Sequence, residues 1–388
     1  MPLSPADILP IDKDALLFGR LWSPEIQGPV VVRVDGERLT DVSRTFPTAR
    51  DLCEAGDPVA ALKAAPGEDA GRLGDVLANT DPDTRDHSRP WLLSPIDLQA
   101  VKAAGVTFVT SMLERVIEER ARGDLSAAAG IRDRIRELVG DDLRRLKPGS
   151  AEAASLKETL IAAGAWSQYL EVGIGPDAEI FTKGQPLSSV GVGADIGVHP
   201  ASNWNNPEPE VVLVVSSQGA IVGATLGNDV NLRDVEGRSA LLLGKAKDNN
   251  AAAAVGPFVR LFDEAFDLEA VSKLEISLTV TGADGFVMNG RSAMSEISRN
   301  PSDLAAQTIN EHHRYPDGLV LFLGTLFAPV EDRYEAGKGF THATGDIVRI
   351  ASDRLGALVN RVQPTDQCEP WTFGASDLMR NLARRGLI

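Results

Sequence analysis

The sequence is poor in the residues that build disulfide frameworks and zinc sites. Its 388 residues include two cysteines, Cys53 and Cys368, and five histidines. Two cysteines so far apart suit a reducing compartment better than a secreted scaffold. Only His312 and His313 are close together, and adjacent rings diverge on regular structure. The sequence therefore predicts neither a disulfide-stapled fold nor a zinc centre.

Long apolar runs and positive charge are also scarce. No window approaches the roughly 20 consecutive apolar residues of a membrane span, and residues 1–30 lack the pattern of a secretory signal. Lys and Arg total 39 against 55 Asp and Glu, a formal net charge of −16. That charge disfavours nucleic acid, and it repels anionic substrates unless a metal or a placed cation holds them locally. We expect a cytoplasmic protein with no nucleic-acid or membrane partner.

Several common catalytic motifs are missing. There is no Gly-x-Ser-x-Gly elbow, and Gly244-Lys245 is followed by Ala246 rather than by the Ser or Thr of a P-loop. Gly191 and Gly193 lack the spacing of a dinucleotide-binding loop. The chemistry must come from other residues.

The length suits two domains. We predict a small N-terminal α/β module at residues 1–90 and a catalytic domain at residues 91–388. Within the module, residues 28–37 and 39–42 predict a hairpin, and the Asp-, Gly-, Pro- and Arg-rich residues 65–90 predict a surface linker.

The second region changes in pattern along its length. Residues 98–107 predict a buried strand, and helical periodicity follows it, including a helical insertion at about residues 122–170. From residue 173 to 362 short strands alternate with turns, before a final helix at 376–385. This order of predicted helices and strands indicates an α+β fold with a sheet-rich, mixed β-roll core.

Acidic residues gather where two of these strands meet. Pro207 and Pro209 force an extended chain, so Glu208 and Glu210 project to the same side just before an apolar strand. Asp229 lies where the returning strand leaves the core, near the same end. Three carboxylates with waters are typical of an octahedral Mg²⁺ or Mn²⁺ site, although two solvated glutamates at a strand start remain the alternative.

Charged residues continue beyond these acids. Arg233, Asp234 and Glu236 form a dense polar cluster, which could also contain a simple structural ion pair. Lys245 follows the apolar residues 240–243, so we expect it to be partly buried and to need a carboxylate or an anionic substrate. A surface loop with two lysines is the alternative.

Four segments in order, NPEPEVVLVV, GNDVNLRD, GKAKDNN and PDGLVLFLGT, resemble the fumarylacetoacetate hydrolase superfamily. The resemblance implies that Glu208, Glu210 and Asp229 bind the metal, and that Lys245 is the site lysine. It further implies substrate-site roles for the following residues: Arg233, Thr325 and Lys183, the last in a strand-like AEIFTK segment.

The lid segment departs from the hydrolases of this superfamily. Where they carry a His and a Glu that activate water, residues 105–114 (GVTFVTSMLE) have Ser111 and Glu114. A serine cannot act as a general base near neutral pH without a partner. This departure and the helical insertion, together with the segments ERVIEERARGD, WSQYLEVGIGPDAEIFTKG and GRSALLLGKAKDNN, resemble the bacterial 2-keto-3-deoxy-D-xylonate dehydratases, which form 2-oxoglutarate semialdehyde.

The resemblance implies a hydro-lyase that uses Mg²⁺ or Mn²⁺ and works through a metal-stabilised enolate. Glu114 and Lys245, and then Glu236, are the expected acid/base or charge-stabilising residues, and Ser111 is expected to contact the substrate. Two alternatives remain open: a metal-dependent C–C hydrolase of acylpyruvates or 2,4-diketo acids, and a Schiff-base lyase that uses Lys245. The family also implies a homodimer or homotetramer.

Overall fold

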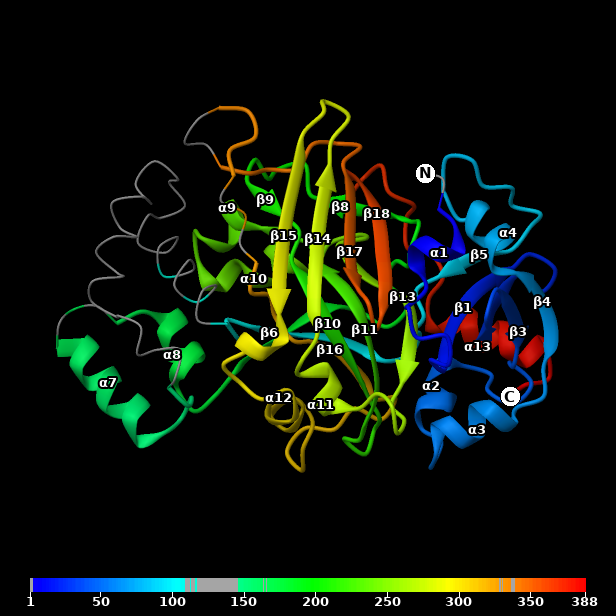
Figure 1. The fold of residues 1–388 in the computed structure, drawn as a ribbon, viewed down its shortest axis with the longest axis horizontal. Coiled ribbons are helices and arrows are strands. Elements are labelled where there is room, and N and C mark those ends of the chain that lie inside the picture. Colours follow the sequence, from blue (N-terminus) through cyan, green and yellow to red (C-terminus); the bar gives the residue numbers. More distant parts are fainter. Residues whose placement is uncertain are drawn as a thin grey trace.

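The computed structural model describes residues 3–108, 112, 116, 146–162, 164, 166–327, 329, 331–335 and 339–388. Two β-sheets face each other at the centre of the molecule, and short helices surround them (Figure 1). Within these residues no helix has both the length and the apolar character needed to cross a bilayer.

Among the described residues, the larger sheet has eleven strands. Its order is β4 (Glu68–Arg72), β3 (Arg38–Asp41), β2 (Gly28–Asp35), β1 (Leu17–Ser23), β13 (Ala253–Leu261), β11 (Ile221–Asp229), β10 (Pro209–Val215), β16 (Leu319–Phe322), β6 (Ala100–Gly105) and β7 (Glu179–Gly184), with β5 (Trp91–Leu93) on β1. The β16–β6 pair is parallel and the other pairs are antiparallel. The sheet is therefore mixed, as predicted.

Two smaller sheets contain the remaining strands of the part that the structure describes. One has the order β15 (Val287–Ala293), β14 (Glu275–Thr281), β17 (Ile347–Ser352), β18 (Gly356–Pro364) and β8 (Asp195–Val198), and the other pairs β12 (Asn231–Leu232) with β9 (Asn205–Asn206). The helices are α1 (Pro5–Ile8), α2 (Ala49–Cys53), α3 (Pro58–Ala64), α4 (Leu73–Ala78), α7 (Ala151–Ala162), α8 (Gln168–Ile174), α9 (Arg233–Glu236), α10 (Leu243–Lys247), α11 (Leu268–Val271), α12 (Pro301–Thr308) and α13 (Ala375–Arg384).

Alternation along β10 explains why both faces of the large sheet are covered. Val211, Leu213 and Val215 pack into the core between the two main sheets, whereas Val212 and Val214 face a second core under α2 and α3. Side chains of a strand alternate between the two faces of its sheet. A strand that is apolar at every position, such as this one, therefore has both of its faces buried. The α+β class predicted from the sequence is confirmed.

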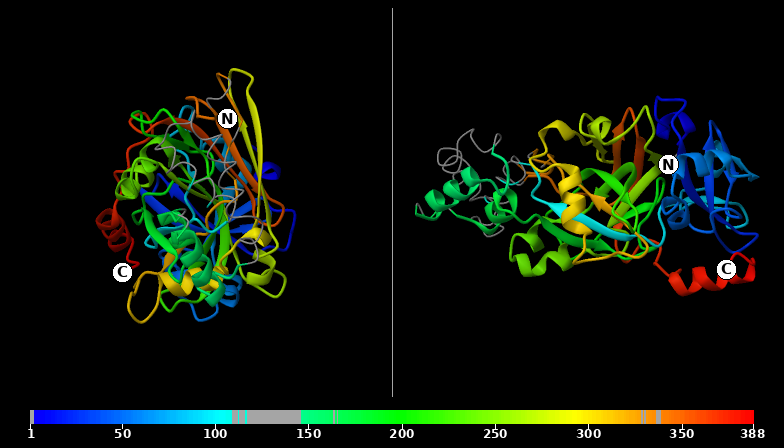
Figure 2. Two further views of the ribbon diagram at one scale, coloured as in Figure 1. Left: turned by 90° about the vertical axis from the view of Figure 1, so that its left-hand side faces the viewer. Right: turned by 90° about the horizontal axis from the view of Figure 1, so that it is seen from below.

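Residues 1–90 extend the large sheet. β1 pairs with β13 through Leu17–Arg260 and Phe18–Val259. At the other end of the chain, α13 lies beneath the N-terminal strands (Figure 2), and Asn381 donates to the carbonyls of Ile26 and Gln27. The boundary near residue 90 stays a prediction, because hydrogen bonds and core contacts cross it.

The predicted surface linker at residues 65–90 is wrong. This segment contains β4 and α4, and Leu73, Val76 and Leu77 of α4 are buried. Their i, i+3, i+4 spacing places them on one helix face, a signal that the polar composition of the segment obscured. The helix α7, within the predicted helical insertion, and α8, which begins at its end, lie at the end of the molecule opposite the N-terminal strands (Figure 1).

Candidate metal centre

Three carboxylates meet where β10 begins and β11 ends. Pro209 pairs with Asn228 and Glu210 with Gly227, and the Asp229 N–H donates to the Glu208 carbonyl at 3.1 Å. Glu208 and Asp229 are thus cross-strand neighbours, and Glu210 is two residues further along the same face. The convergence predicted from the sequence is present.

The three groups are close enough to share one cation. One oxygen from each of Glu208, Glu210 and Asp229 lies within 4.8 Å of the others. Their exposed fractions are 4, 2 and 2 % respectively. Oxygen donors of this kind are the ligands that Mg²⁺ and Mn²⁺ prefer.

Lys247 lies at this cluster, and Lys245 does not. The Lys247 ammonium contacts Glu208 at 2.6 Å and Asp229 at 2.9 Å, and it lies 5.5 Å from the centre of the Phe181 ring. Lys245 is exposed. The expectation that Lys245 is partly buried was wrong, because the apolar residues before it are not a core segment: Leu241 is 95 % exposed.

Lys183 of β7 is the second buried lysine of the cluster. Its ammonium lies 2.8 Å from Asp229 and donates to the backbone carbonyls of Val230 and Lys247. Lys183 therefore holds Asp229 in position and joins the end of α10 to the strand.

The electrostatics show a shortage of positive charge. Burial, and then the charges of Asp229 and Glu208, raise the pKa of Glu210 well above its ordinary value. Burial also raises the pKa of Asp229, but the Lys183 and Lys247 ammonium groups outweigh it and leave that pKa low. Burial lowers the pKa of Lys183. Two ammonium groups cannot balance three carboxylates, so the donor set fits a divalent cation.

A small cavity of about 30 Å³ adjoins the cluster. Of the residues predicted for the site, Glu236 and Thr325 line it beside the three carboxylates. Arg233 is buried against the ring of Trp204 at 4.4 Å and donates to the Pro329 carbonyl. The structure thus brings Glu236 and Thr325 to the carboxylates, whereas Arg233 packs on Trp204 and does not line the cavity.

Two predicted residues cannot be placed. Ser111 and Glu114 lie outside the described residues. Conversely, sequence reasoning missed the N–H of Gly324, which donates to Glu210 at 2.7 Å. Gly324 has a φ of +86°, and a Cβ there would approach Thr107 Oγ1 to 2.1 Å. Only glycine fits this position, but a lone glycine after a strand gives no such signal in the sequence.

Residues 171–363 match the family model described as the fumarylacetoacetate (FAA) hydrolase C-terminal domain. That match spans β7 to β18 and so includes all three carboxylates and both buried lysines. This part of the chain is an FAA hydrolase domain. The resemblance seen in the sequence is confirmed.

Two curated relatives match the chain at 32 % identity. One is a probable 2-keto-3-deoxyxylonate dehydratase from Haloferax volcanii, matched over 194 residues, which are 50 % of this chain and 63 % of that protein. The other is a 2-dehydro-3-deoxy-D-arabinonate dehydratase from Saccharolobus solfataricus, matched over 185 residues, 48 % of this chain and 58 % of that protein. The chain thus spans less than two thirds of the length of these relatives.

Solved structures share the fold over 90 % of this chain. A 2-keto-3-deoxy-D-arabinonate dehydratase complexed with magnesium and 2,5-dioxopentanoate has a TM-score of 0.61 at 20 % identity, over 99 % of its own chain. A fumarylacetoacetate hydrolase from Exiguobacterium antarcticum has a TM-score of 0.54 at 15 % identity, over all of its chain. These likenesses show that the fold is shared over most of the chain.

Proposed function

We propose that the protein is a divalent-metal-dependent dehydratase that converts a 2-keto-3-deoxypentonate of the D-xylonate series to 2-oxoglutarate semialdehyde. The observation that carries this proposal is the buried triad of Glu208, Glu210 and Asp229 with two lysines bound to it. The two curated relatives, both named as dehydratases of 2-keto-3-deoxy acids, support the reaction class.

The charge of the cluster suits an anionic substrate. With a divalent ion bound and all five side chains ionised, the site carries one positive charge, against a net charge of −16 for the chain. A local cation of this kind attracts a monoanion that the rest of the protein repels. We propose Mg²⁺ or Mn²⁺ as the ion, which would polarise the keto group and so make the C3 proton removable.

The chain's own side chains would hold and move the protons. In the overall reaction the C3–H and C4–O bonds break and water leaves, and the C5 aldehyde forms by tautomerisation. Lys247, held between Glu208 and Asp229, is our proposal for charge stabilisation or for one proton transfer. Glu236, which lines the cavity, and Glu114 are the proposed carboxyl partners. Ser111, Arg233 and Thr325 are proposed to position the substrate.

The test is a paired assay of 2-keto-3-deoxypentonate and an acylpyruvate, each with and without EDTA. We expect water elimination from the first substrate, loss of activity in EDTA and recovery with Mg²⁺. Cleavage of the acylpyruvate with no elimination would instead support the C–C hydrolase. Trapping of substrate by borohydride in the presence of EDTA would support an imine mechanism.

Asp229→Asn tests the metal assignment itself. Asp229 contacts both lysines and faces both glutamates, so its loss should abolish Mg²⁺ binding measured by calorimetry and lower kcat by about 10²-fold or more. Mg²⁺ binding and turnover near those of the wild type would contradict the assignment.

A further inference from the structure

The strand register that aligns the carboxylates continues past them. In β9 and β12, Asn206 pairs with Asn231, in the same register that pairs Pro209 with Asn228. The two chain segments thus remain opposite each other through Glu208 and Asp229. Because opposite residues share a face and side chains alternate along a strand, Asn206 and Asn231 project from the same face as the acids.

These two amides are buried with hydrogen bonds unmade. Asn206 is 2 % exposed and Asn231 is fully buried. Neither the Oδ1 nor the Nδ2 atom of Asn231 has a partner among the described residues, and neither does Oδ1 of Asn206. Within the described part of the chain, the Nδ2 group of Asn206 donates only to the carbonyl of its neighbour Pro207, at 2.9 Å. Buried polar groups without partners destabilise a fold, so they point to a partner outside the chain.

The unpaired atoms define the chemistry of that partner. They comprise two acceptors and one donor group with no charge, which matches hydroxyl groups, since a hydroxyl both donates and accepts. A carboxylate only accepts hydrogen bonds, so it could not pair with the two amide oxygens, Oδ1 of Asn206 and Oδ1 of Asn231. The pair lies two residues along the strands, about 7 Å, from Glu208 and Asp229. Four bonds join the keto carbon of a 2-keto-3-deoxypentonate to its terminal hydroxyl oxygen, at about 1.5 Å a bond.

We propose that Asn206 and Asn231 bind the terminal hydroxyl end of the substrate and thereby select a polyhydroxylated keto acid over one that ends in a methyl group. This inference rests on the proposed function, and it deepens it by naming the residues that discriminate between substrates. A site built to hydrogen-bond a hydroxyl rejects an analogue that lacks it, because its own polar groups then stay unpaired.

The kinetic test compares 2-keto-3-deoxypentonate with its 5-deoxy analogue in the wild type and in Asn231→Leu and Asn206→Leu. Both substrates can lose the C4 hydroxyl. We expect the wild type to prefer the pentonate by about 10²-fold or more in kcat/KM. The variants should lose most of that preference and keep their activity on the 5-deoxy analogue. A preference retained in both variants would overturn the inference, whereas a wild type that dehydrates neither compound would overturn the proposed function.

A second measurement needs neither metal nor turnover. Leucine has the same branching and the same number of side-chain heavy atoms as asparagine, and none of them is polar, so Asn231→Leu removes unpaired groups without opening a cavity. We expect its thermal midpoint in EDTA to rise by about 2 °C or more. The control is Asn360→Leu, because buried Asn360 donates to the carbonyls of Gly191 and Ala194, and its midpoint should fall. A fall in Asn231→Leu as well would show that the amide is structural and overturn the inference.

Discussion

At the scale of single residues, Lys247 is the side chain on which the acidic cluster depends most. It contacts two of the three carboxylates directly, and its own exposed fraction is 3 %. Removing one partner from a buried charged cluster leaves the others uncompensated, at a cost of about 3–5 kcal/mol. A bound divalent ion would supply the missing positive charge.

Lys247→Met should therefore lower the free energy of unfolding by about 3–5 kcal/mol in EDTA, and by less at saturating Mg²⁺. Its kcat should fall by about 10²-fold or more, since a buried ammonium group is lost from the site. Urea unfolding and the dehydratase assay give the two values. Lys245→Met is the matched control, because Lys245 is exposed on the same helix, and it should match the wild type in both. Equal effects in the two variants would remove Lys247 from the mechanism.

The sequence could not identify the correct lysine because the two candidates are only two positions apart. On an α-helix that separation turns a side chain by about 200°, so one lysine faces inward and the other outward. Ala246 and Lys247 are the buried pair of α10, but a five-residue helix gives too short a pattern to fix its phase. The carboxylates were predictable, by contrast, because prolines and the two-residue strand period determine where they point.

Asp346 provides a pH-dependent contribution to stability. Burial raises its pKa, but His342, Arg333 and the Ala343 N–H outweigh that effect and lower it to about 2, from an ordinary value of 3.8. The stabilisation, about 2 kcal/mol, is complete above about pH 4 and is lost as the pH falls toward 2. In urea unfolding, the wild type should exceed Asp346→Asn in stability at pH 5, and the difference should shrink as the pH falls. A constant difference would contradict this assignment.

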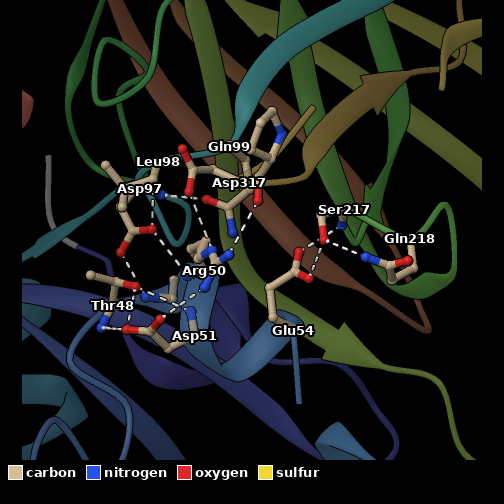
Figure 3. Close-up of polar contacts among 12 residues, drawn as sticks. Thr48, Arg50, Asp51, Glu54, Asp97, Leu98, Gln99, Ser217, Gln218 and Asp317 are labelled. Carbon is tan, nitrogen blue, oxygen red and sulfur yellow. Dashed lines mark hydrogen bonds and ion pairs between the residues drawn. The ribbon is translucent and has the colours of Figure 1, made fainter. Parts of the chain in front are cut away.

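At the scale of elements, Asp97 joins α2 to the central sheet. Its carboxylate accepts from the N–H groups of Ala49 and Arg50 in the first turn of α2, and from that of Leu98 (Figure 3). The buried Arg20 lies 3.6 Å from it. One buried side chain therefore caps a helix and pairs with a buried cation.

Asp97→Asn should lower the free energy of unfolding by about 3–5 kcal/mol, because Arg20 loses its counterion. Asp317→Asn is the control. Asp317 also pairs with α2, through Arg50 at 3.3 Å, but its side chain is 53 % exposed. Exposed pairs contribute about 0–1 kcal/mol. Denaturant unfolding of both variants checks the contrast, and similar losses in the two would show that the capping role is misassigned.

The accuracy of the sequence predictions also varied by element. Short strands within residues 173–362, such as β10 and β16, and the hairpin formed by residues 28–37 and 39–42 were predictable, because apolar runs and an Asp-Gly turn mark them. The helix α4 was not, since only Leu73, Val76 and Leu77 mark it in a polar segment. Pairing between distant segments, such as β1 with β13, has no local signal at all.

At the scale of the whole molecule, residues 1–90 are part of the structure that supports the site. Asp12 contacts the buried Arg260 of β13 at 2.6 Å and Arg354 at 2.5 Å. A Cβ at Gly19 of β1 would come within 2.6 Å of Phe258 on β13, so the two strands pack closely. β13 lies next to β11, which carries Asp229. The N-terminal strands thus support the site indirectly: β1 packs on β13, and β13 pairs with β11.

The fragment 91–388 should therefore not fold alone, although the sequence suggests a boundary near residue 90. Without residues 1–90, Arg260 loses its Asp12 partner, and the pairing edge of β13 is exposed. We expect the fragment to show no cooperative thermal transition and no Mg²⁺ binding by calorimetry, and co-expression with residues 1–90 as a separate chain to restore both. A sharp transition with full Mg²⁺ affinity in the fragment alone would mean that the N-terminal strands form an independent domain, because the site would then need nothing from them.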